Sequence, residues 1–258
     1  MRILLSGIAG HMGREVEKLC KAGYRGAELV CGVDPMGASS DVPVFRCFDE
    51  VPADMGIDCI IDFSHHSATE AMLGFATARK IPTVVATTGH TEDELGLIEA
   101  ASRGIPVFHS GNMSLGIALL VELAKLTAAA MPEADIEIIE RHHNRKLDAP
   151  SGTALMLAKA VCDTRDGAFI NTGRSGHGKR ERGEIGIHAV RMGNIVGIHE
   201  VIVGTASQTI TLKHEAHDRA LFAEGGIAAA EFLVKCGAGL YDMKSIVDDG
   251  APAEACVI

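Results

Sequence analysis

The sequence predicts an α/β fold in two parts: a parallel sheet covered by helices, then an α+β domain built on an open antiparallel or mixed sheet. Three observations predict it. Residues 1–113 alternate short apolar runs with helical patterns, which is typical of parallel sheets. A glycine-rich turn follows the first apolar run directly. Beyond residue 184, strand-like segments are separated by turns of about three residues, which favours antiparallel pairing.

The elements of the first part follow from this alternation. Buried parallel strands are predicted where short apolar runs end in small or polar residues: 2–6, 27–33, 57–62, 83–87 and 106–110. Helices are predicted between them at 12–22, 67–79 and 91–102. Thr91 followed by Glu94 predicts a capping box at the start of the last helix. We place the first domain at 1–113.

The pattern changes at Ser114. We expect an apolar helix over 114–130, a strand over 134–140 and a helix from about 151 to 162. Segment 163–183 is rich in glycine and arginine, which predicts a mobile surface loop able to act as a lid. Strands at 184–191, 195–204 and 208–214 predict an antiparallel meander, followed by a helix over about 218–236. The second domain is placed at 114–217, and 218–258 is expected to pack back on the first.

Composition excludes several classes of function. The chain has 258 residues, 47% of them hydrophobic, and a net charge of -10 that makes nucleic acid an unsuitable partner. No apolar stretch reaches the ~20 residues that span a bilayer, so we expect no membrane contact and a cytoplasmic location. Seven cysteines without a C-x-x-C pair argue against a disulfide framework or a thiolate zinc site, and no H-E-x-x-H occurs, so no metal is expected.

The glycine turn GIAGHMGR at 7–14 predicts a dinucleotide site in a Rossmann-like domain. Its G-x-x-G-x-x-G spacing lets the backbone approach a pyrophosphate, and the next helix offers N–H groups to the phosphates. Asp34 lies 21 residues past Gly13, where a carboxylate can bond an adenosine ribose. Asp34 would repel a 2′-phosphate and Pro35 follows it, which favours NADH, although NADPH stays possible. The alternative is a tight turn without a ligand.

The stretch ERHHNRKLDAPSGTA at 140–154 combines histidines, cations and a helix start. His142 and His143 supply imidazole groups, the side chain type that is best suited to donate a proton near neutral pH. Ser151 can cap a helix whose first N–H groups come from Gly152 and Thr153, and such a helix start binds a carboxylate. Lys146 adds charge nearby, which favours a substrate with one or more carboxylates. Two alternatives remain open: a hydrated charged surface, and a metal site.

The segment EIIERHHNRKLDAPSGTA at 137–154 closely resembles the signature of the dihydrodipicolinate reductase (4-hydroxy-tetrahydrodipicolinate reductase) family. Further stretches follow in family order: GIAGHMGR (7–14), DFS (62–64), ATTG (86–89), GNMS (111–114), AVRMGNIVGIHEV (189–201) and GLYDM (239–243). The resemblance implies NAD(P)H-dependent reduction of a cyclic unsaturated dicarboxylate in lysine and diaminopimelate biosynthesis. It also implies a homotetramer assembled through the C-terminal sheets.

The resemblance implies roles for individual residues. His142 would be the proton donor and Lys146 the second catalytic residue, with His143, Gly152 and Thr153 binding substrate beside Ser151. The cofactor would contact Gly7, Ile8, Ala9, Gly10, His11, Met12, Asp34, Ala86, Thr87, Thr88, Ser110, Gly111, Asn112 and Met113. Ala86 stands where the family has glycine. The alternatives are another NAD-linked reductase on this scaffold and a non-catalytic NAD-sensing protein.

Overall fold

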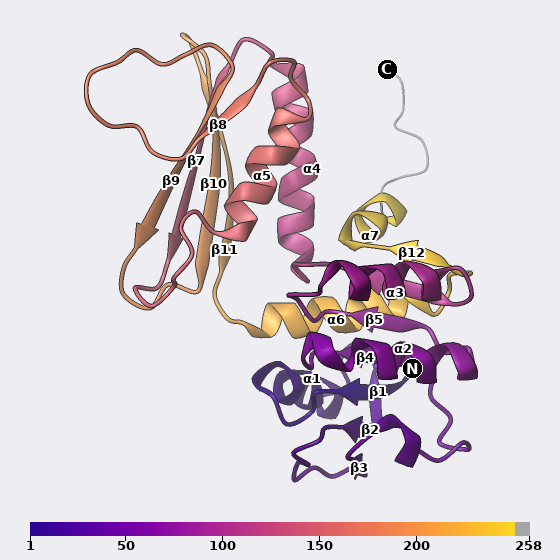
Figure 1. Cartoon of the computed structure of the whole chain (residues 1–258). Helices are drawn as coiled ribbons and strands as arrows, with labels where there is room; N and C mark the ends of the chain where they lie inside the picture. Colours follow the sequence, from indigo (N-terminus) through magenta and orange to yellow (C-terminus); the bar gives the residue numbers. More distant parts are fainter. Residues whose placement is uncertain (251–258) are drawn as a thin grey trace. The chain divides into compact units, whose positions relative to one another are not determined.

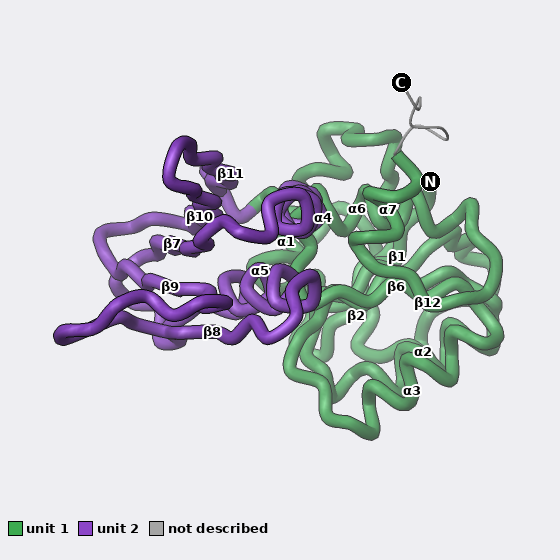
Figure 2. The backbone as a smooth tube through the Cα atoms, turned by 90° about the horizontal axis from the view of Figure 1, so that it is seen from above, with its two compact units in different colours: residues 1–115, 220–258 green, residues 116–219 purple. Residues whose placement is uncertain are grey.

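The computed structural model describes residues 1–250 of the chain (Figure 1). The remaining residues, Cys256 among them, lie outside the described part. The chain divides into two compact units (Figure 2): unit 1 holds residues 1–115 and the segment from 220 onward, and unit 2 holds residues 116–219. The assignment of a cofactor to one and a substrate to the other stays a prediction.

Unit 1 is built on a seven-stranded sheet in the order β12-β6-β5-β4-β1-β2-β3, and all its strand pairs are parallel. The strands are β1 (Arg2–Ser6), β2 (Glu28–Val33), β3 (Val44–Phe45), β4 (Cys59–Asp62), β5 (Thr83–Val85), β6 (Pro106–His109) and β12 (Gly239–Tyr241). Both faces are covered, which explains why the central strands are continuous apolar runs. The chain leaves β1 for β2 on one side and reaches β4 on the other, so a topological switch point lies beside β1.

Five α-helices of unit 1 belong to residues 1–250: α1 (His11–Lys21), α2 (Thr69–Arg79), α3 (Glu92–Ser102), α6 (Ala220–Leu233) and α7 (Met243–Asp249). α6 packs against α1, and α2 packs against α3. The predicted capping box of α3 is confirmed, because Thr91 accepts from the Glu94 backbone N–H and the Glu94 side chain bonds back to Thr91. β3, β12 and α7 were not predicted from the sequence, because they are short and lack strong periodicity.

Unit 2 is built on a mixed five-stranded sheet in the order β11-β10-β7-β9-β8. Its strands are β7 (Asp135–His142), β8 (Phe169–Asn171), β9 (Glu184–Arg191), β10 (Gly197–Gly204) and β11 (Thr209–Ala216). Helices α4 (Leu115–Ala130) and α5 (Gly152–Cys162) cover one face, as Figure 1 shows. Their buried leucine and alanine residues meet the inward-facing isoleucines and valines of β7, β9 and β10.

One prediction for unit 2 was wrong, and another needs correction at one short strand. The strands at 184–191 and 195–204 do not pair as a hairpin, because β7 lies between them: β9 pairs with β7 in parallel and β10 pairs with β7 antiparallel. The predicted pairing of β10 with β11 is confirmed. Segment 163–183 is not irregular throughout, since β8 within it pairs with β9. Arg180 binds this segment to the sheet through Asp135 and Glu137.

The described residues show neither a membrane-spanning helix nor a metal cluster. No helix within residues 1–250 is long and apolar enough to cross a bilayer. Over the same range, no group of three or more His, Cys, Asp or Glu side chains is arranged to hold a metal ion.

Candidate active site

The glycine turn of unit 1 is shaped by close backbone contacts. Gly7 has φ +81°, and a Cβ there would lie 2.7 Å from the backbone of Phe63 and Ser64. A Cβ on Gly13 would lie 2.2 Å from the Gly7 carbonyl oxygen. Gly10 is the N-cap of α1 and offers no side-chain cap, so the first N–H groups of this helix have no capping side chain as acceptor. These features fit the phosphates of a dinucleotide.

Asp34 is placed at the end of β2, and its carboxylate holds the turn itself. One oxygen accepts a hydrogen bond of 3.0 Å from the Ala9 backbone N–H, and the other accepts one of 3.0 Å from Met36. The residue is only 8% exposed. Asp34 therefore fixes the turn to β2, a structural task that the sequence analysis did not foresee. Each carboxylate oxygen keeps one acceptor position for a ribose hydroxyl.

The other residues predicted to contact the cofactor follow the neighbouring strands β5 and β6. Residues 86–88 leave the carboxyl end of β5, and residues 110–113 leave that of β6. Buried Asp62, at the end of β4, holds the loop after β5 because it accepts a 2.7 Å hydrogen bond from the Thr87 hydroxyl. It also accepts a 2.6 Å bond from the Ser64 hydroxyl, which follows β4 itself. Since strands of a parallel sheet end at the same edge, the predicted residues gather at one edge of unit 1.

A histidine cluster that the sequence analysis did not single out occupies the same edge. The rings of His65 and His66 lie 4.2 Å apart, and those of His90 and His109 lie 5.3 Å apart. His66 bonds Glu94 at 2.9 Å, and this bond is the main reason why the pKa of Glu94 is lowered to about 2. Burial, together with His90, lowers the pKa of His109.

In unit 2, the predicted proton donor His142 stands at the end of β7 and is 9% exposed. Its Nδ1 lies 2.5 Å from an oxygen of Glu140, two residues earlier on the same face of the strand. Glu140 is fully buried, and Arg191 at the end of β9 grips both its oxygens at 2.7 and 2.8 Å. Burial raises the pKa of Glu140, but hydrogen bonds from Arg191, His142 and Ser151 outweigh burial and lower the pKa overall.

A second buried histidine lies beside this pair. The ring of His199 on β10 meets the ring of His142 edge-on, with 5.1 Å between centroids. Its Nε2 lies 3.3 Å from the Ser151 hydroxyl, which itself caps α5 by accepting from Ala154. Burial, reinforced by the charge of His142, lowers the pKa of His199 to about 4, so this ring is neutral at pH 7. The prediction that Ser151 caps α5 is confirmed.

The chain after β7 is held by the turn that joins β9 to β10. Met192 donates its backbone N–H to the carbonyl of His142, and His143 donates to the carbonyl of Ile195 at 2.8 Å. His143 also lies 3.5 Å from the Arg219 guanidinium through its Nε2. Burial and the cations Arg145, Arg219 and Lys146 lower the pKa of His143. The crossing turn thus fixes the backbone from which the predicted site residues project.

Lys146 and the start of α5 share one carboxylate. The Lys146 ammonium lies 2.8 Å from Asp148, and this contact is the main reason why the pKa of Asp148 is lowered. The Gly152 backbone N–H, at the first residue of α5, also contributes to the lower pKa. Two of the groups predicted to bind substrate therefore converge on one carboxylate. Asp148 supplies this carboxylate within the chain.

Comparison with known proteins identifies the family. A family model for the N-terminus of dihydrodipicolinate reductase matches residues 1–113, and a model for its C-terminus matches residues 116–247. The chain belongs to the dihydrodipicolinate reductase family. The resemblance seen in the sequence and the expected α/β fold are thereby confirmed.

Relatives in this family match over nearly their whole length. The 4-hydroxy-tetrahydrodipicolinate reductase of Caldanaerobacter subterraneus subsp. tengcongensis is 43% identical and is matched over 97% of this chain and 99% of its own. That of Clostridium novyi is 41% identical over 95% and 98%. A solved structure of dipicolinate-bound dihydrodipicolinate reductase from a Paenisporosarcina species is 26% identical, with a TM-score of 0.76 over 94% of this chain and 97% of that one.

Within this member of the dihydrodipicolinate reductase family, the sequence analysis missed residues that come from distant segments. Arg191 and His199 reach the site from β9 and β10, and Asp62 on β4 bonds Thr87 in the predicted cofactor loop after β5. Glu140 was in the quoted stretch, and its spacing offered a signal. Residues i and i+2 of a strand share a face, so the strand prediction could have paired Glu140 with His142.

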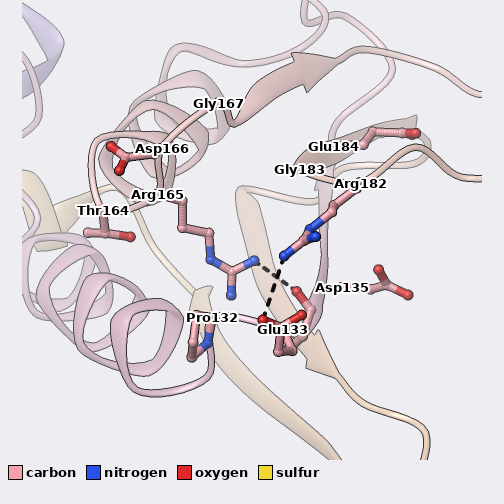
Figure 3. Close-up of a pocket in the computed structure, with 11 residues that line it drawn as sticks. Pro132, Glu133, Asp135, Thr164, Arg165, Asp166, Gly167, Arg182, Gly183 and Glu184 are labelled. Carbon is pink, nitrogen blue, oxygen red and sulfur yellow. Dashed lines mark hydrogen bonds and ion pairs between the residues drawn. The ribbon is translucent and has the colours of Figure 1, made fainter.

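Unit 2 of the present chain also has a surface cavity of about 490 Å³, lined by residues 132–135, 164–167 and 182–184 (Figure 3). None of the predicted site residues lines it. Arg165 points across it, but its guanidinium is engaged by the backbone carbonyls of Ala128, Met131 and Ala134. Arg165 therefore satisfies backbone carbonyl groups in the last turn of α4 and just after it. Its role at the cavity is structural.

Proposed function

We propose that this chain reduces 4-hydroxy-tetrahydrodipicolinate to tetrahydrodipicolinate with NADH or NADPH, a step of lysine and diaminopimelate biosynthesis. The observation that carries the proposal is the group formed by His142, Glu140 and Lys146 beside the start of α5. It joins a candidate proton donor to a binding site for carboxylates. The named relatives, which match over almost the whole chain, support the same reaction.

In this proposal His142 protonates the substrate. When the cofactor is bound, its reduced nicotinamide supplies the hydride. Loss of the 4-hydroxyl group as water leaves a conjugated C=C–C=N system in the substrate. Hydride adds to one end of this system, negative charge builds up on the far atom, and a proton from His142 neutralises it. A nearby acid lowers that barrier, typically by ~10²–10⁴-fold. His142 is buried and bonded through Nδ1 to Glu140, which leaves Nε2 to face the substrate.

Lys146, His143 and the first N–H groups of α5 at Gly152 and Thr153 bind the substrate carboxylates, with Ser151 holding the helix start in place. The position of the Asp148 carboxylate supports this assignment, because it already receives Lys146 and the Gly152 backbone. A substrate carboxylate would replace Asp148 on these donors. Close local charges act here despite the acidic chain, because salt screens charges that lie beyond about 8–10 Å.

The cofactor is assigned to the edge of unit 1 that holds the glycine turn, Asp34 and the loops after β5 and β6. Two features support this assignment: Gly7 and Gly13 have no room for a Cβ, and no side chain caps the N-terminus of α1. We infer a preference for NADH, because the buried Asp34 carboxylate would repel a 2′-phosphate. A ratio of kcat/KM for NADPH to that for NADH above one would contradict it.

We further infer a homotetramer, with unit 2 providing the contacts between subunits. The sheet face opposite α4 and α5 carries the partly exposed apolar residues Ile139, Val190, Ile198 and Ile202. Exposed apolar side chains on an open sheet face suit contact with a second subunit. The biosynthetic reaction would take place in the cytoplasm. Sedimentation equilibrium tests the assembly, and a monomer at micromolar concentration would refute it.

The test of the reaction is a coupled assay. The preceding synthase condenses pyruvate with aspartate semialdehyde, and consumption of the reduced cofactor is followed at 340 nm. We expect His142→Gln to lower kcat by about 10²-fold or more with little change in KM, and Lys146→Ala to lower kcat and raise KM. Cofactor oxidation that does not depend on the synthase product would favour a different reductase. Cofactor binding without oxidation would favour a sensing protein.

A further inference from the structure

The ring of His142 is held by one buried carboxylate. We propose that Glu140 is the positioning residue for the proton donor: it sets which ring nitrogen of His142 delivers the proton, and it aligns that ring with the start of α5. This rests on the proposed role of His142 as the donor. Glu140 lies beneath the ring on β7 and is fully buried, so it acts through His142 and not on a ligand.

All acceptor positions of the Glu140 carboxylate are filled. Oε2 receives His142 Nδ1 at 2.5 Å and Arg191 Nη1 at 2.8 Å. Oε1 receives Arg191 Nη2 at 2.7 Å and the Ser151 backbone N–H at 2.9 Å. Two oxygens of a carboxylate accept about four hydrogen bonds, so this group is saturated. The carboxylate is therefore locked from β7, β9 and the start of α5, and it cannot turn without breaking several bonds.

The saturated carboxylate fixes the tautomer of His142. An ionised carboxylate can only accept hydrogen bonds, so Nδ1 of His142 must carry a hydrogen in both charge states of the ring. In the neutral ring, Nε2 then has a lone pair, and in the imidazolium it carries the proton that is transferred. Glu140 stays ionised because its hydrogen bonds outweigh its burial. The geometry thus assigns proton delivery to Nε2.

The charges around His142 are balanced by its neighbours. Arg191 from β9 neutralises Glu140, which keeps the carboxylate from holding the imidazolium proton too strongly. His199 from β10 faces the ring and is neutral at pH 7. From the chain after β7, Lys146 adds positive charge and is itself paired with Asp148, whereas burial and nearby cations lower the pKa of His143 and disfavour its charged form. Glu140 is therefore the negative group in direct contact with the His142 ring.

Glu140 also joins the donor to the carboxylate-binding helix start. The Ser151 backbone N–H bonds Glu140, while the Ser151 hydroxyl caps α5 at Ala154. One carboxylate thus sets the position of the ring that would protonate the substrate and of the N–H groups that would hold it. Positioning of this kind matters because a misplacement of about 1 Å can cost about 10²-fold in rate.

Glu140→Gln tests the proposal because it keeps the shape and removes the charge. The Gln amide can still accept from Arg191, but its NH₂ then faces Nδ1, which becomes an acceptor, and the neutral ring carries its hydrogen on Nε2. We expect kcat to fall by about 10²–10⁴-fold with KM changed less than about threefold. The imidazolium also loses its negative partner. The pH at which kcat falls on the alkaline side should therefore move down, an effect that a purely structural role does not produce.

The matched control is Glu200→Gln. Glu200 on β10 accepts hydrogen bonds of 3.1 and 3.2 Å from Nη1 and Nη2 of Arg141, on the opposite face of the same sheet. These bonds involve no histidine. Glu200→Gln should lose a similar arginine contact while keeping kcat and its pH profile. An equal loss of kcat in both variants would overturn the proposal, since it would show a general effect of weakening the sheet.

Side-chain ¹⁵N NMR of His142 gives a readout without any assay. In the unsubstituted chain the neutral ring should show a protonated Nδ1 and an unprotonated Nε2, and in Glu140→Gln the pattern should reverse. A neutral unsubstituted chain with its hydrogen on Nε2 overturns the proposal, even if Glu140→Gln fails to fold. If the tautomers reverse as expected but the unsubstituted chain does not reduce the substrate, the proposed reaction fails while the positioning role of Glu140 stands.

Discussion

Gly197 offers a direct test of which side of His142 faces the reaction. This residue is the first of β10, one position before Ile198, which pairs with Arg141 of β7. A Cβ placed on it would lie 3.2 Å from His142 Nε2, 3.5 Å from Cδ2 and 3.8 Å from the Cε1 atom of His199. Gly197→Ala therefore sets a methyl group against the nitrogen that we assign to proton delivery.

The size of the effect follows from these contacts. A separation of 3.2 Å is a few tenths of an ångström closer than ordinary contact, so either the ring or β10 must shift. The ring cannot yield easily, because Glu140 binds its other nitrogen at 2.5 Å. A shift of this size, together with partial screening of Nε2, should lower kcat by roughly 10–10²-fold. The cost in stability should stay within the 1–3 kcal/mol typical of adding a methyl group to a packed site.

The control is Gly204→Ala at the other end of β10. A Cβ there meets Thr209 Oγ1 at 3.7 Å, which is ordinary contact. Both changes add one methyl group to one strand, and neither glycine has a positive φ. Steady-state kinetics in the coupled assay, with thermal unfolding of each variant, separates rate from stability. A Gly197→Ala chain with the kcat of the Gly204→Ala chain would refute the assignment of Nε2.

Two further predictions concern stability. Arg165→Ala should lower the free energy of unfolding, measured with urea, by about 2–3 kcal/mol, because the charged hydrogen bonds of Arg165 to backbone carbonyls are lost. Arg182→Ala should leave the free energy of unfolding unchanged, because the ion pair of Arg182 with Glu133 is exposed. The pKa of His199 falls from 6.5 to about 4 on folding, so between these values the unfolded chain binds a proton that the folded chain does not, and stability rises with pH across that window. Keeping His199 neutral in the folded chain lowers the free energy of unfolding at acid pH by up to about 3 kcal/mol. The prediction is contradicted if the free energy of unfolding of His199→Gln rises from pH 4.5 to 6.5 as steeply as that of the unsubstituted chain.

The first unit could be predicted from sequence because its signals are local. Each buried strand is a continuous apolar run, and each run ends in small or polar residues where the parallel strands reach one edge. The turn after β1 needs glycine for reasons that a sequence displays: Gly7 has a positive φ, and Gly13 has no room for a Cβ. The capping box at Thr91 likewise involves residues three positions apart. The two-residue strand β3 carries too little pattern to be found.

The mixed sheet of unit 2 could not be predicted because its order depends on a distant strand. The short connection between β9 and β10 is typical of a hairpin. In the structure it crosses the end of β7 instead, and its backbone bonds the chain at 142–144, as Met192 does to the carbonyl of His142. Nothing in residues 184–204 reveals that a strand some 50 residues earlier lies between them. Turn length alone therefore gave the wrong neighbour.

In the candidate site, too, residues close together in the sequence could be predicted, and residues from distant strands could not. His142, Lys146 and Ser151 lie within ten residues of one another, so their motif could be read directly. Arg191 and His199 could not be assigned, because β9 and β10 flank β7 only through long-range pairing. A single sequence shows a histidine and a lysine in one stretch, but it does not show which carboxylate or which second ring packs against them.

The central position of β7 explains why the wrong topology would also have hidden the chemistry. If β9 and β10 paired directly, β7 would lie at an edge of these strands, and only one of Arg191 and His199 could flank its end. With β7 between them, Arg191 neutralises Glu140 from one side while neutral His199 packs against His142 from the other. Burying a carboxylate is costly unless it is paired and hydrogen-bonded. The mixed order of the sheet is therefore what allows an ionised Glu140 to remain buried beneath the ring that it orients.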